Sequence, residues 1–169
     1  QTMKPSIKFN MPASEYRSAP GVSKSELDDF TRKCPAWYRA KMDGLIPREE
    51  TPAMLFGTLL HSMVLDGKRG DYYVKPEGMT FASKEGKQWK AGHSDKPIIS
   101  QAEDDELQRS ASALLKHRHV APLFGSGASE VSLFGVHDET DFIIKGRADW
   151  LAKSHLLDIK TTADASNAT

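Results

Sequence analysis

The stretch FIIKGRADWLAKSHLLDIKTT, residues 142–162, contains the pattern from which the central part of the fold is predicted. Apolar and polar residues alternate from Phe142 to Ala152 and again from His155 to Thr162, which is the period of half-buried β-strands. The Lys153-Ser154 pair between the two runs predicts a two-residue hairpin loop. The sequence therefore predicts an antiparallel hairpin in this part of the chain.

The register of this hairpin places two carboxylates opposite each other. With a two-residue loop, Asp149 stands opposite Asp158, and Arg147 stands opposite Lys160, all on one face. Like charges at opposed positions are destabilising, and a divalent cation would offset the repulsion because Mg²⁺ prefers oxygen ligands. The alternative is a solvated face on which the two basic side chains pair with the acids. Both interpretations stay open at this point.

A third strand is predicted from Ser129 to Val136, SEVSLFGV, which gives a three-strand meander. If the loop before the next strand is Asp138 to Asp141, Glu130 stands opposite Asp149. A five-residue loop would shift the pairing by one residue and turn Glu130 to the other face. The first register adds a third acid to the pair, whereas the second leaves Glu130 as a charge at the strand edge.

Capping boxes mark the starts of two predicted helices. Ser23 is followed by Glu26, and Ser100 is followed by Glu103, which is the spacing at which the two side chains satisfy the first backbone amides of a helix. Apolar residues at helical spacing follow both boxes. Each box therefore predicts an amphipathic helix.

Another helix is predicted from Ala53 to Leu65, with Thr51 as N-cap and Pro52 at the first helical position. Gly57 and His61 lie four residues apart and so share a face, where a glycine lets another backbone approach. A lone histidine on an apolar helix is more often a core residue than a ligand. The helix alone favours that interpretation of His61.

The segment from Gly67 to Pro97 is rich in glycine, lysine and aspartate and predicts mainly a long loop. Its lysines are interleaved with two aromatic residues: Lys84, Lys87, Lys90 and Lys96, with Phe81 and Trp89. Two interpretations stay open, a mobile basic flap over a polyanion and an ordinary surface loop.

Composition sets the limits on the kind of protein. The 169 residues predict an extended lead-in over residues 1–22 and a single domain over residues 23–169. Basic and acidic residues number 23 each, which excludes a general basic coat for polyanions. The single cysteine, Cys34, excludes an internal disulfide and favours a reducing, cytoplasmic setting. No apolar run reaches the roughly 18 residues of a membrane span, so no membrane partner is expected.

Asp149 on one strand and Asp158-Ile159-Lys160 on the next resemble the PD-(D/E)XK nuclease superfamily, whose signature is an acid followed by D/E-x-K on a hairpin. Further motifs resemble its RecB/RecE-type branch: Gly57-x-x-x-His61, Glu130, Gly146-Arg147-Ala148-Asp149 and Leu157-Asp158-Ile159-Lys160-Thr161-Thr162. Two early motifs are similar to the exonuclease VIII (RecE) family of phage and prophage origin: Val22-Ser23-x-Ser25-x-Leu27 and Cys34-Pro35-x-x-Tyr38.

The resemblance implies an α/β fold with a restriction-endonuclease-like αβββαβ core, in which helices flank a mixed sheet. Because the sequence stops at Thr169, the last helix and strand of that core are expected to be missing. The implied activity is Mg²⁺-dependent exonuclease digestion of linear double-stranded DNA, 5′ to 3′, in phage-type recombination, with Mn²⁺ able to substitute. Expected partners are double-stranded DNA ends and a single-strand annealing protein, with a homo-oligomeric ring in the cytoplasm of a bacterial host.

The resemblance also implies roles for individual residues. The implied metal ligands are Asp149, Asp158, Glu130, the Ile159 carbonyl and His61. Lys160 would orient or deprotonate the attacking water, and His61 would support the metal or the scissile phosphate. If two ions act, Asp149 is the expected bridging ligand. Two alternatives remain: a catalytically inactive nuclease-like module that binds DNA or protein, and a PD-(D/E)XK endonuclease.

Overall fold

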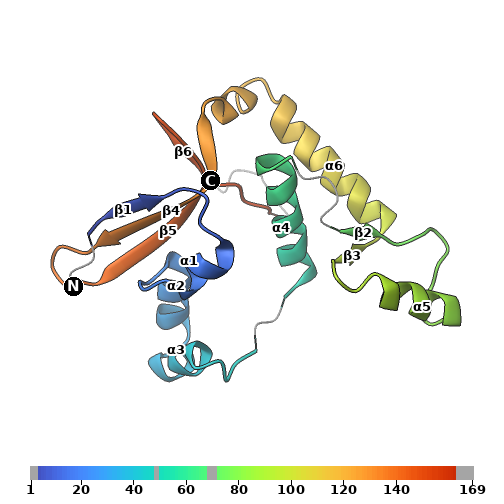
Figure 1. Cartoon of the computed structure of the whole chain (residues 1–169), viewed down its shortest axis with the longest axis horizontal. Helices are drawn as coiled ribbons and strands as arrows, with labels where there is room; N and C mark the ends of the chain where they lie inside the picture. The colour runs from blue at the N-terminus through green and yellow to red at the C-terminus, as the bar shows by residue number, and fades with distance from the viewer. Residues whose placement is uncertain (1–3, 48–49, 68–71, 163–169) are drawn as a thin grey trace, which may run out of the picture. The chain divides into compact units, whose positions relative to one another are not determined.

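The computed structural model describes residues 4–47, 50–67 and 72–162 (Figure 1). The chain divides into two compact units. The first, which we call the sheet unit, comprises Gln1–Glu50 and Ser126–Asp158. The second, the helical unit, comprises Thr51–Gly125 and Ile159–Thr169. The single domain predicted over residues 23–169 stays a prediction.

The sheet unit is built on a four-stranded antiparallel sheet in the order β1-β4-β5-β6 (Figure 1). Its strands are β1 Ser6–Lys8, β4 Gly127–Val136, β5 Ile143–Ala152 and β6 Leu156–Leu157. Alternation buries residues on both faces of the central pair: Val131 and Ala148 on one face, and Phe134 and Lys145 on the other. A parallel bridge between Val22 and Ile144 adds a parallel element to the sheet.

Of the two registers that the sequence left open between β4 and β5, the structure has the one with the four-residue loop. Ser129 pairs with Trp150, and Val131 pairs with Ala148, as a four-residue loop over 138–141 requires. The alternating pattern placed the two strands but left the length of their loop open, and a shift of one residue moves every apolar side chain to the other face.

The second hairpin has the predicted turn but a shorter last strand. The Ala152 amide donates to the His155 carbonyl at 2.9 Å, as expected for a two-residue loop. The prediction of a strand running to Thr162 is wrong beyond Leu157, where β6 ends. The next apolar residue, Ile159, is buried in the core of the helical unit instead of extending the β5–β6 ladder.

The lead-in predicted over residues 1–22 has regular structure, contrary to expectation. It contains β1, which pairs with β4, and helix α1 Ala13–Ser18. Met11 is buried, and the Tyr16 ring lies 6.2 Å from the Phe134 ring of β4. A three-residue strand has too few positions to show a period of two, so sequence reasoning missed it.

Helices α2 Lys24–Arg32 and α3 Pro35–Met42 complete the sheet unit. The helical unit contains α4 Pro52–Leu65, α5 Lys84–Gly92, α6 Gln101–Lys116 and a short 3₁₀ helix, η1 Ala121–Phe124. Strands β2 Tyr73–Val74 and β3 Ile98–Ile99 pair in parallel beside them. Both predicted capping boxes and the Thr51 cap are confirmed.

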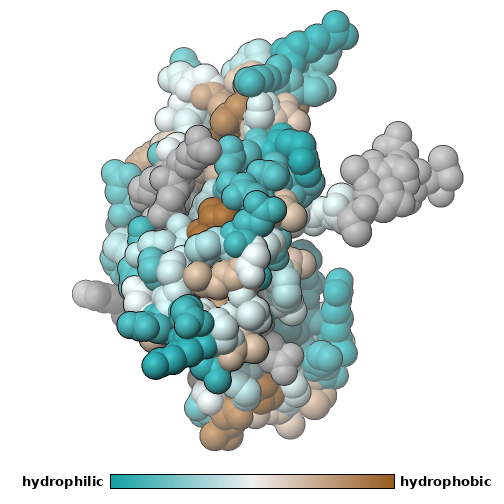
Figure 2. All heavy atoms as spheres, turned by 90° about the vertical axis from the view of Figure 1, so that its right-hand side faces the viewer, coloured by the Kyte–Doolittle hydropathy of each residue, from teal (hydrophilic) through white to brown (hydrophobic). Residues whose placement is uncertain are grey.

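Helices α4 and α6 pack together around the core of the helical unit. The buried members of that core are Leu59, Leu60, Val64, Tyr72, Ile99, Leu107, Ala111 and Ile159. No helix in the described part of the chain is long and apolar enough to cross a membrane. The face seen in Figure 2 is largely hydrophilic, with hydrophobic residues in small separate patches.

The long loop predicted from Gly67 to Pro97 contains helix α5, so that prediction is wrong over Lys84–Gly92. Ser83 caps the helix by accepting from the Gly86 amide at 3.0 Å. Gly86 is buried, and a Cβ there would come within 2.0 Å of the Thr80 carbonyl oxygen. Gly86 is needed because two backbone segments approach each other closely at this position, and it does not mark a loop.

The capping box of α6 gives a pH-dependent prediction. The Ser100 amide donates to the Glu103 carboxylate at 2.7 Å and lowers the pKa of Glu103 from its ordinary value of 4.5. A lowered pKa means that the contribution to stability is present above pH 4.5 and is lost as the pH falls through the folded-state value. We expect Glu103→Ala to lower the free energy of unfolding by about 1 kcal/mol at pH 7 and by clearly less at pH 3, measured by urea titration.

The control for this prediction is Glu106→Ala, which removes an exposed carboxylate on the same helix. Its effect should be small at both pH values, because exposed ion pairs contribute little. If the Glu103→Ala effect were the same at pH 7 and pH 3, the charged capping contact would not be its source.

Candidate functional site

Two acids lie at opposed positions in the β4–β5 ladder. Glu130 and Asp149 stand opposite each other, because the residues before and after them pair in register. Both residues are half-buried. The strands therefore bring these two predicted site residues together, as the four-residue loop predicted.

The backbone of Glu130 is unusual for a strand residue. Its φ of 51° lies in the left-handed region, which is uncommon for residues other than glycine, and the ladder pairing is interrupted there. Such conformations cost free energy and cluster at functional sites, where the surrounding structure holds them. Sequence reasoning missed this feature, because a glutamate in an alternating run carries no signal for left-handed backbone.

The side chain of Arg147 holds the Glu130 carboxylate. Arg147 Nη2 donates to Glu130 Oε2 at 2.7 Å, and Nη1 donates to the Met11 carbonyl at 3.0 Å. The Arg147 side chain is 17% exposed, and that of Glu130 is 47% exposed. The prediction that Arg147 stands opposite Lys160 is wrong, because the ladder ends at Leu157. Arg147 does pair with an acid, but as a largely buried residue and not on a solvated face.

Lys145, two residues before Arg147 on the same face of β5, is also bound to the N-terminal segment. Its Nζ donates to the Ala19 carbonyl at 2.8 Å and to the Arg17 carbonyl at 3.2 Å. The side chain is buried. The basic residues of this face are thus held by backbone carbonyls of a segment to which the sequence assigned no role.

The D-x-K motif follows directly after β6. Asp158 and Lys160 are exposed, whereas Ile159 between them is buried. This alternation is what an extended segment gives when its acid and its lysine project to the same side. The boundary between the two compact units falls between Asp158 and Ile159.

His61 on α4 contacts the backbone of this motif. Its Nε2–H donates to the Ile159 carbonyl at 2.9 Å, and the ring is partly buried. On the same helix face, a Cβ added to Gly57 would lie 3.5 Å from Thr161 Oγ1. Helix α4 therefore runs beside residues 159–161, and both members of the Gly57-x-x-x-His61 motif lie against that segment.

A metal would be held here by carboxylates. Asp149 and Asp158 offer hard oxygen donors, which are the ligands that Mg²⁺ prefers, so the donor chemistry fits this ion. Within the described residues no three His, Cys, Asp or Glu side chains are grouped so as to hold a metal ion. Glu130 is engaged with Arg147 in this arrangement.

The chain combines an antiparallel sheet and flanking helices with the acid-plus-D-x-K signature of PD-(D/E)XK proteins. The chain belongs to the family described as PDDEXK-like domain of unknown function (DUF3799), whose model matches residues 23–169. This match confirms the predicted superfamily and its mixed α/β fold class, and places the chain among nuclease-type folds. No curated protein matches the chain. Strand β1 and helix α1 lie before the matched residues.

Proposed function

We propose that this chain is a Mg²⁺-dependent exodeoxyribonuclease of the RecE type, which hydrolyses linear double-stranded DNA from 5′ to 3′ in phage-type recombination. The contact between His61 Nε2 and the Ile159 carbonyl carries the proposal. It joins the two motifs, Gly57-x-x-x-His61 and Asp158-Ile159-Lys160, on which the resemblance to the RecB/RecE-type branch depends. The family match supports the nuclease-type domain to which both motifs belong.

Each residue has a definite task in this proposal. Asp149 and Asp158 would hold Mg²⁺, which would supply a lowered pKa for water and positive charge opposite the attacked phosphate. Lys160, exposed beside Asp158, orients the attacking water or takes its proton. His61 positions the Ile159 carbonyl and with it the backbone that joins the acid to the lysine. Glu130 is a further acid, whose carboxylate Arg147 orients.

The proposed partners come from the same resemblance. They are double-stranded DNA ends, a single-strand annealing protein and further copies of the chain in a ring, in the cytoplasm of a bacterial host.

The test compares a linear duplex with the same plasmid as a covalently closed circle, in Mg²⁺, in Mn²⁺ and in EDTA. We expect digestion of the linear form with either metal, an intact circle, and no digestion in EDTA. Phosphorothioate linkages at the 5′ ends should block digestion, whereas the same linkages at the 3′ ends should not. Cutting of the circle would instead identify an endonuclease.

A second candidate is a nuclease-like module that binds DNA without cutting it. The engagement of Glu130 with Arg147 favours this candidate, because it directs one of the three acids toward a cation of the protein itself. This candidate predicts that a linear duplex is bound in Mg²⁺ and recovered intact. Digestion in the same experiment excludes it.

A further inference from the structure

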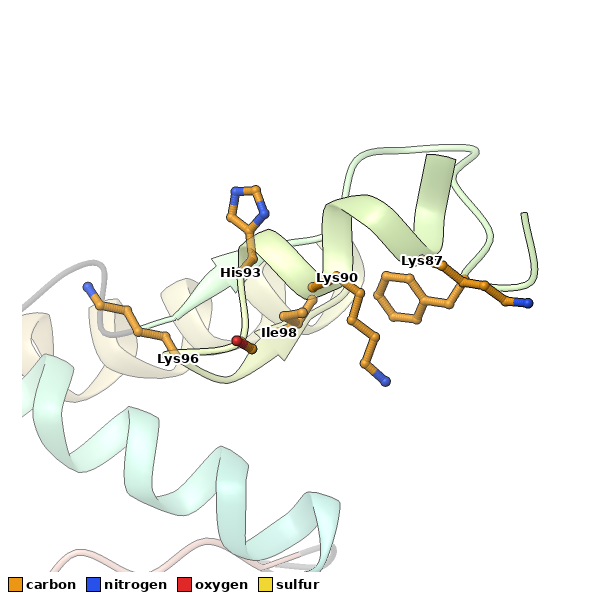
Figure 3. Close-up of a pocket in the computed structure, with 8 residues that line it drawn as sticks. Lys87, Lys90, His93, Lys96 and Ile98 are labelled. Carbon is orange, nitrogen blue, oxygen red and sulfur yellow. The ribbon is translucent and has the colours of Figure 1, made fainter. Parts of the chain in front are cut away.

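A second site lies in the helical unit, at helix α5. A pocket of about 580 Å³ is lined by three lysines and a histidine, and none of the described residues that line it is a carboxylate. Figure 3 shows Lys87 and Lys90 extending from α5, and Lys96 and His93 placed along the segment that leads to β3. Residues 72–99 contain five lysines and three acids, so the charge around the pocket is positive. We call this site the α5 pocket.

The aromatic rings at the pocket pack against one another. Trp89 stacks on His93 with centroids 4.1 Å apart and also lies parallel to Phe81 at 6.4 Å. Tyr73 meets His93 edge to face at 4.6 Å. His93 Nδ1–H donates to the Trp89 carbonyl at 2.7 Å, which fixes the histidine ring. The cluster is therefore a scaffold and leaves little open ring surface for a base to stack on.

The same rings hold lysine ammonium groups. Lys90 and Lys75 lie over Phe81, at 5.2 and 5.5 Å from its centroid, and Lys96 lies over Tyr73 at 5.9 Å. Such cation–π contacts restrict the motion of a long side chain, while its ammonium group keeps its positive charge. Of the lysines that line the pocket, Lys90 and Lys96 are thus partly ordered before any ligand arrives, which reduces the entropy lost on binding an anion.

We propose that the α5 pocket binds the phosphodiester backbone of single-stranded DNA without reading its bases; the choice of DNA rests on the proposed function. Lys87 and Lys90 line the pocket and are both exposed. Their ammonium groups attract phosphates, and the contact is independent of sequence. A single strand is flexible enough to lower a phosphate into a concave site, whereas duplex DNA is stiff over about 150 base pairs. Because the aromatic rings already contact one another, attraction between lysines and phosphates takes the place of the base stacking that is common in single-strand sites.

The test measures fluorescence anisotropy of a labelled 20-nucleotide oligo-dT in EDTA, at several salt concentrations. The variant Lys87→Gln/Lys90→Gln is expected to raise the Kd about tenfold at low salt. The slope of log K against log salt should fall in magnitude by about 1.4, because each phosphate contact to a single strand contributes about 0.7. Lys87→Arg/Lys90→Arg keeps both charges and should bind within about threefold of the wild type.

The matched control is Lys84→Gln/Lys116→Gln, which removes two exposed lysines of the same unit that do not line the pocket. It should change the Kd less than about twofold, and circular dichroism should show all variants folded. An equal loss in the control would overturn the proposal, since the effect would then be general charge. If the lysine variant lost as much or more affinity for a blunt duplex, the assignment to a single strand would be overturned. If dTMP at the same phosphate concentration competed fully with oligo-dT, the pocket would be assigned to a nucleotide instead.

Failure of this proposal is distinguishable from failure of the nuclease proposal. Binding in EDTA requires no cleavage, so the effect of Lys87→Gln/Lys90→Gln on oligo-dT binding can be measured whether or not the chain cuts DNA. A wild-type chain that binds oligo-dT through the lysines but never cuts DNA would overturn only the proposed activity. A chain that digests DNA, yet binds oligo-dT equally well without Lys87 and Lys90, would overturn only the α5 pocket.

Discussion

Asp158→Asn is expected to lower the Mg²⁺-dependent digestion of linear duplex DNA on the order of 10³-fold, which is typical for loss of one group that stabilises transition-state charge. Asparagine keeps the size of the side chain but removes the negative charge that would hold a divalent cation. Asp158 is exposed and lies just after β6, so the substitution should leave the fold intact. Initial rates on an end-labelled duplex measure the effect.

The matched control is Asp138→Asn, the same substitution at an exposed aspartate of the loop between β4 and β5. It should digest DNA at the wild-type rate and melt at the same temperature as Asp158→Asn. Lys160→Gln should also lose about 10²–10⁴-fold, as expected of a residue that handles the proton of the attacking water. Full activity of Asp158→Asn would show that the D-x-K motif takes no part in DNA digestion.

The meander could be predicted because its signals are local. Alternation identifies β4 and β5, and the two-residue loop at Lys153-Ser154 gives the register between β5 and β6. The opposition of Glu130 and Asp149 depended on a four-residue loop, which alternation alone did not decide. The end of β6 could not be predicted in this way. Alternation continues through the D-x-K motif, but any extended segment that buries every second residue has the same pattern, and here Ile159 is buried in a different core.

The contacts of the site were less accessible to sequence reasoning. Arg147 donates to the Met11 carbonyl, which lies 136 residues earlier in the chain. Every residue has a backbone carbonyl, so nothing in the sequence marks this one as the acceptor. The contact from His61 to Ile159 spans 98 residues. Periodicity favoured a core histidine at His61, and only the resemblance to a known motif indicated a place beside the D-x-K segment.

The largest effect on stability is expected from Arg147→Met. Methionine keeps the packing of the arginine stem but leaves the Met11 carbonyl and the Glu130 carboxylate without their donor. Hydrogen bonds to charged groups contribute about 1.5–3 kcal/mol each. Breaking a fully buried pair costs about 3–5 kcal/mol, but the Glu130 side chain is 47% exposed, so solvent screening lowers the contribution of this pair. Arg147 Nε is buried and has no hydrogen-bond partner in the described structure, which lowers the net contribution of the side chain. We therefore expect a loss of about 3 kcal/mol in urea unfolding.

The change should appear first in the N-terminal segment, because Arg147 and Lys145 bind its carbonyls at Met11, Arg17 and Ala19. Hydrogen exchange at the β1 amides should accelerate in Arg147→Met more than exchange at β5. Arg39→Met removes an exposed arginine paired with Asp43 and should change stability by less than about 0.5 kcal/mol. If Arg147→Met kept wild-type exchange at β1, the ladder with β4 and the Tyr16–Phe134 contact would suffice to hold the segment, and Arg147 would serve only to orient Glu130.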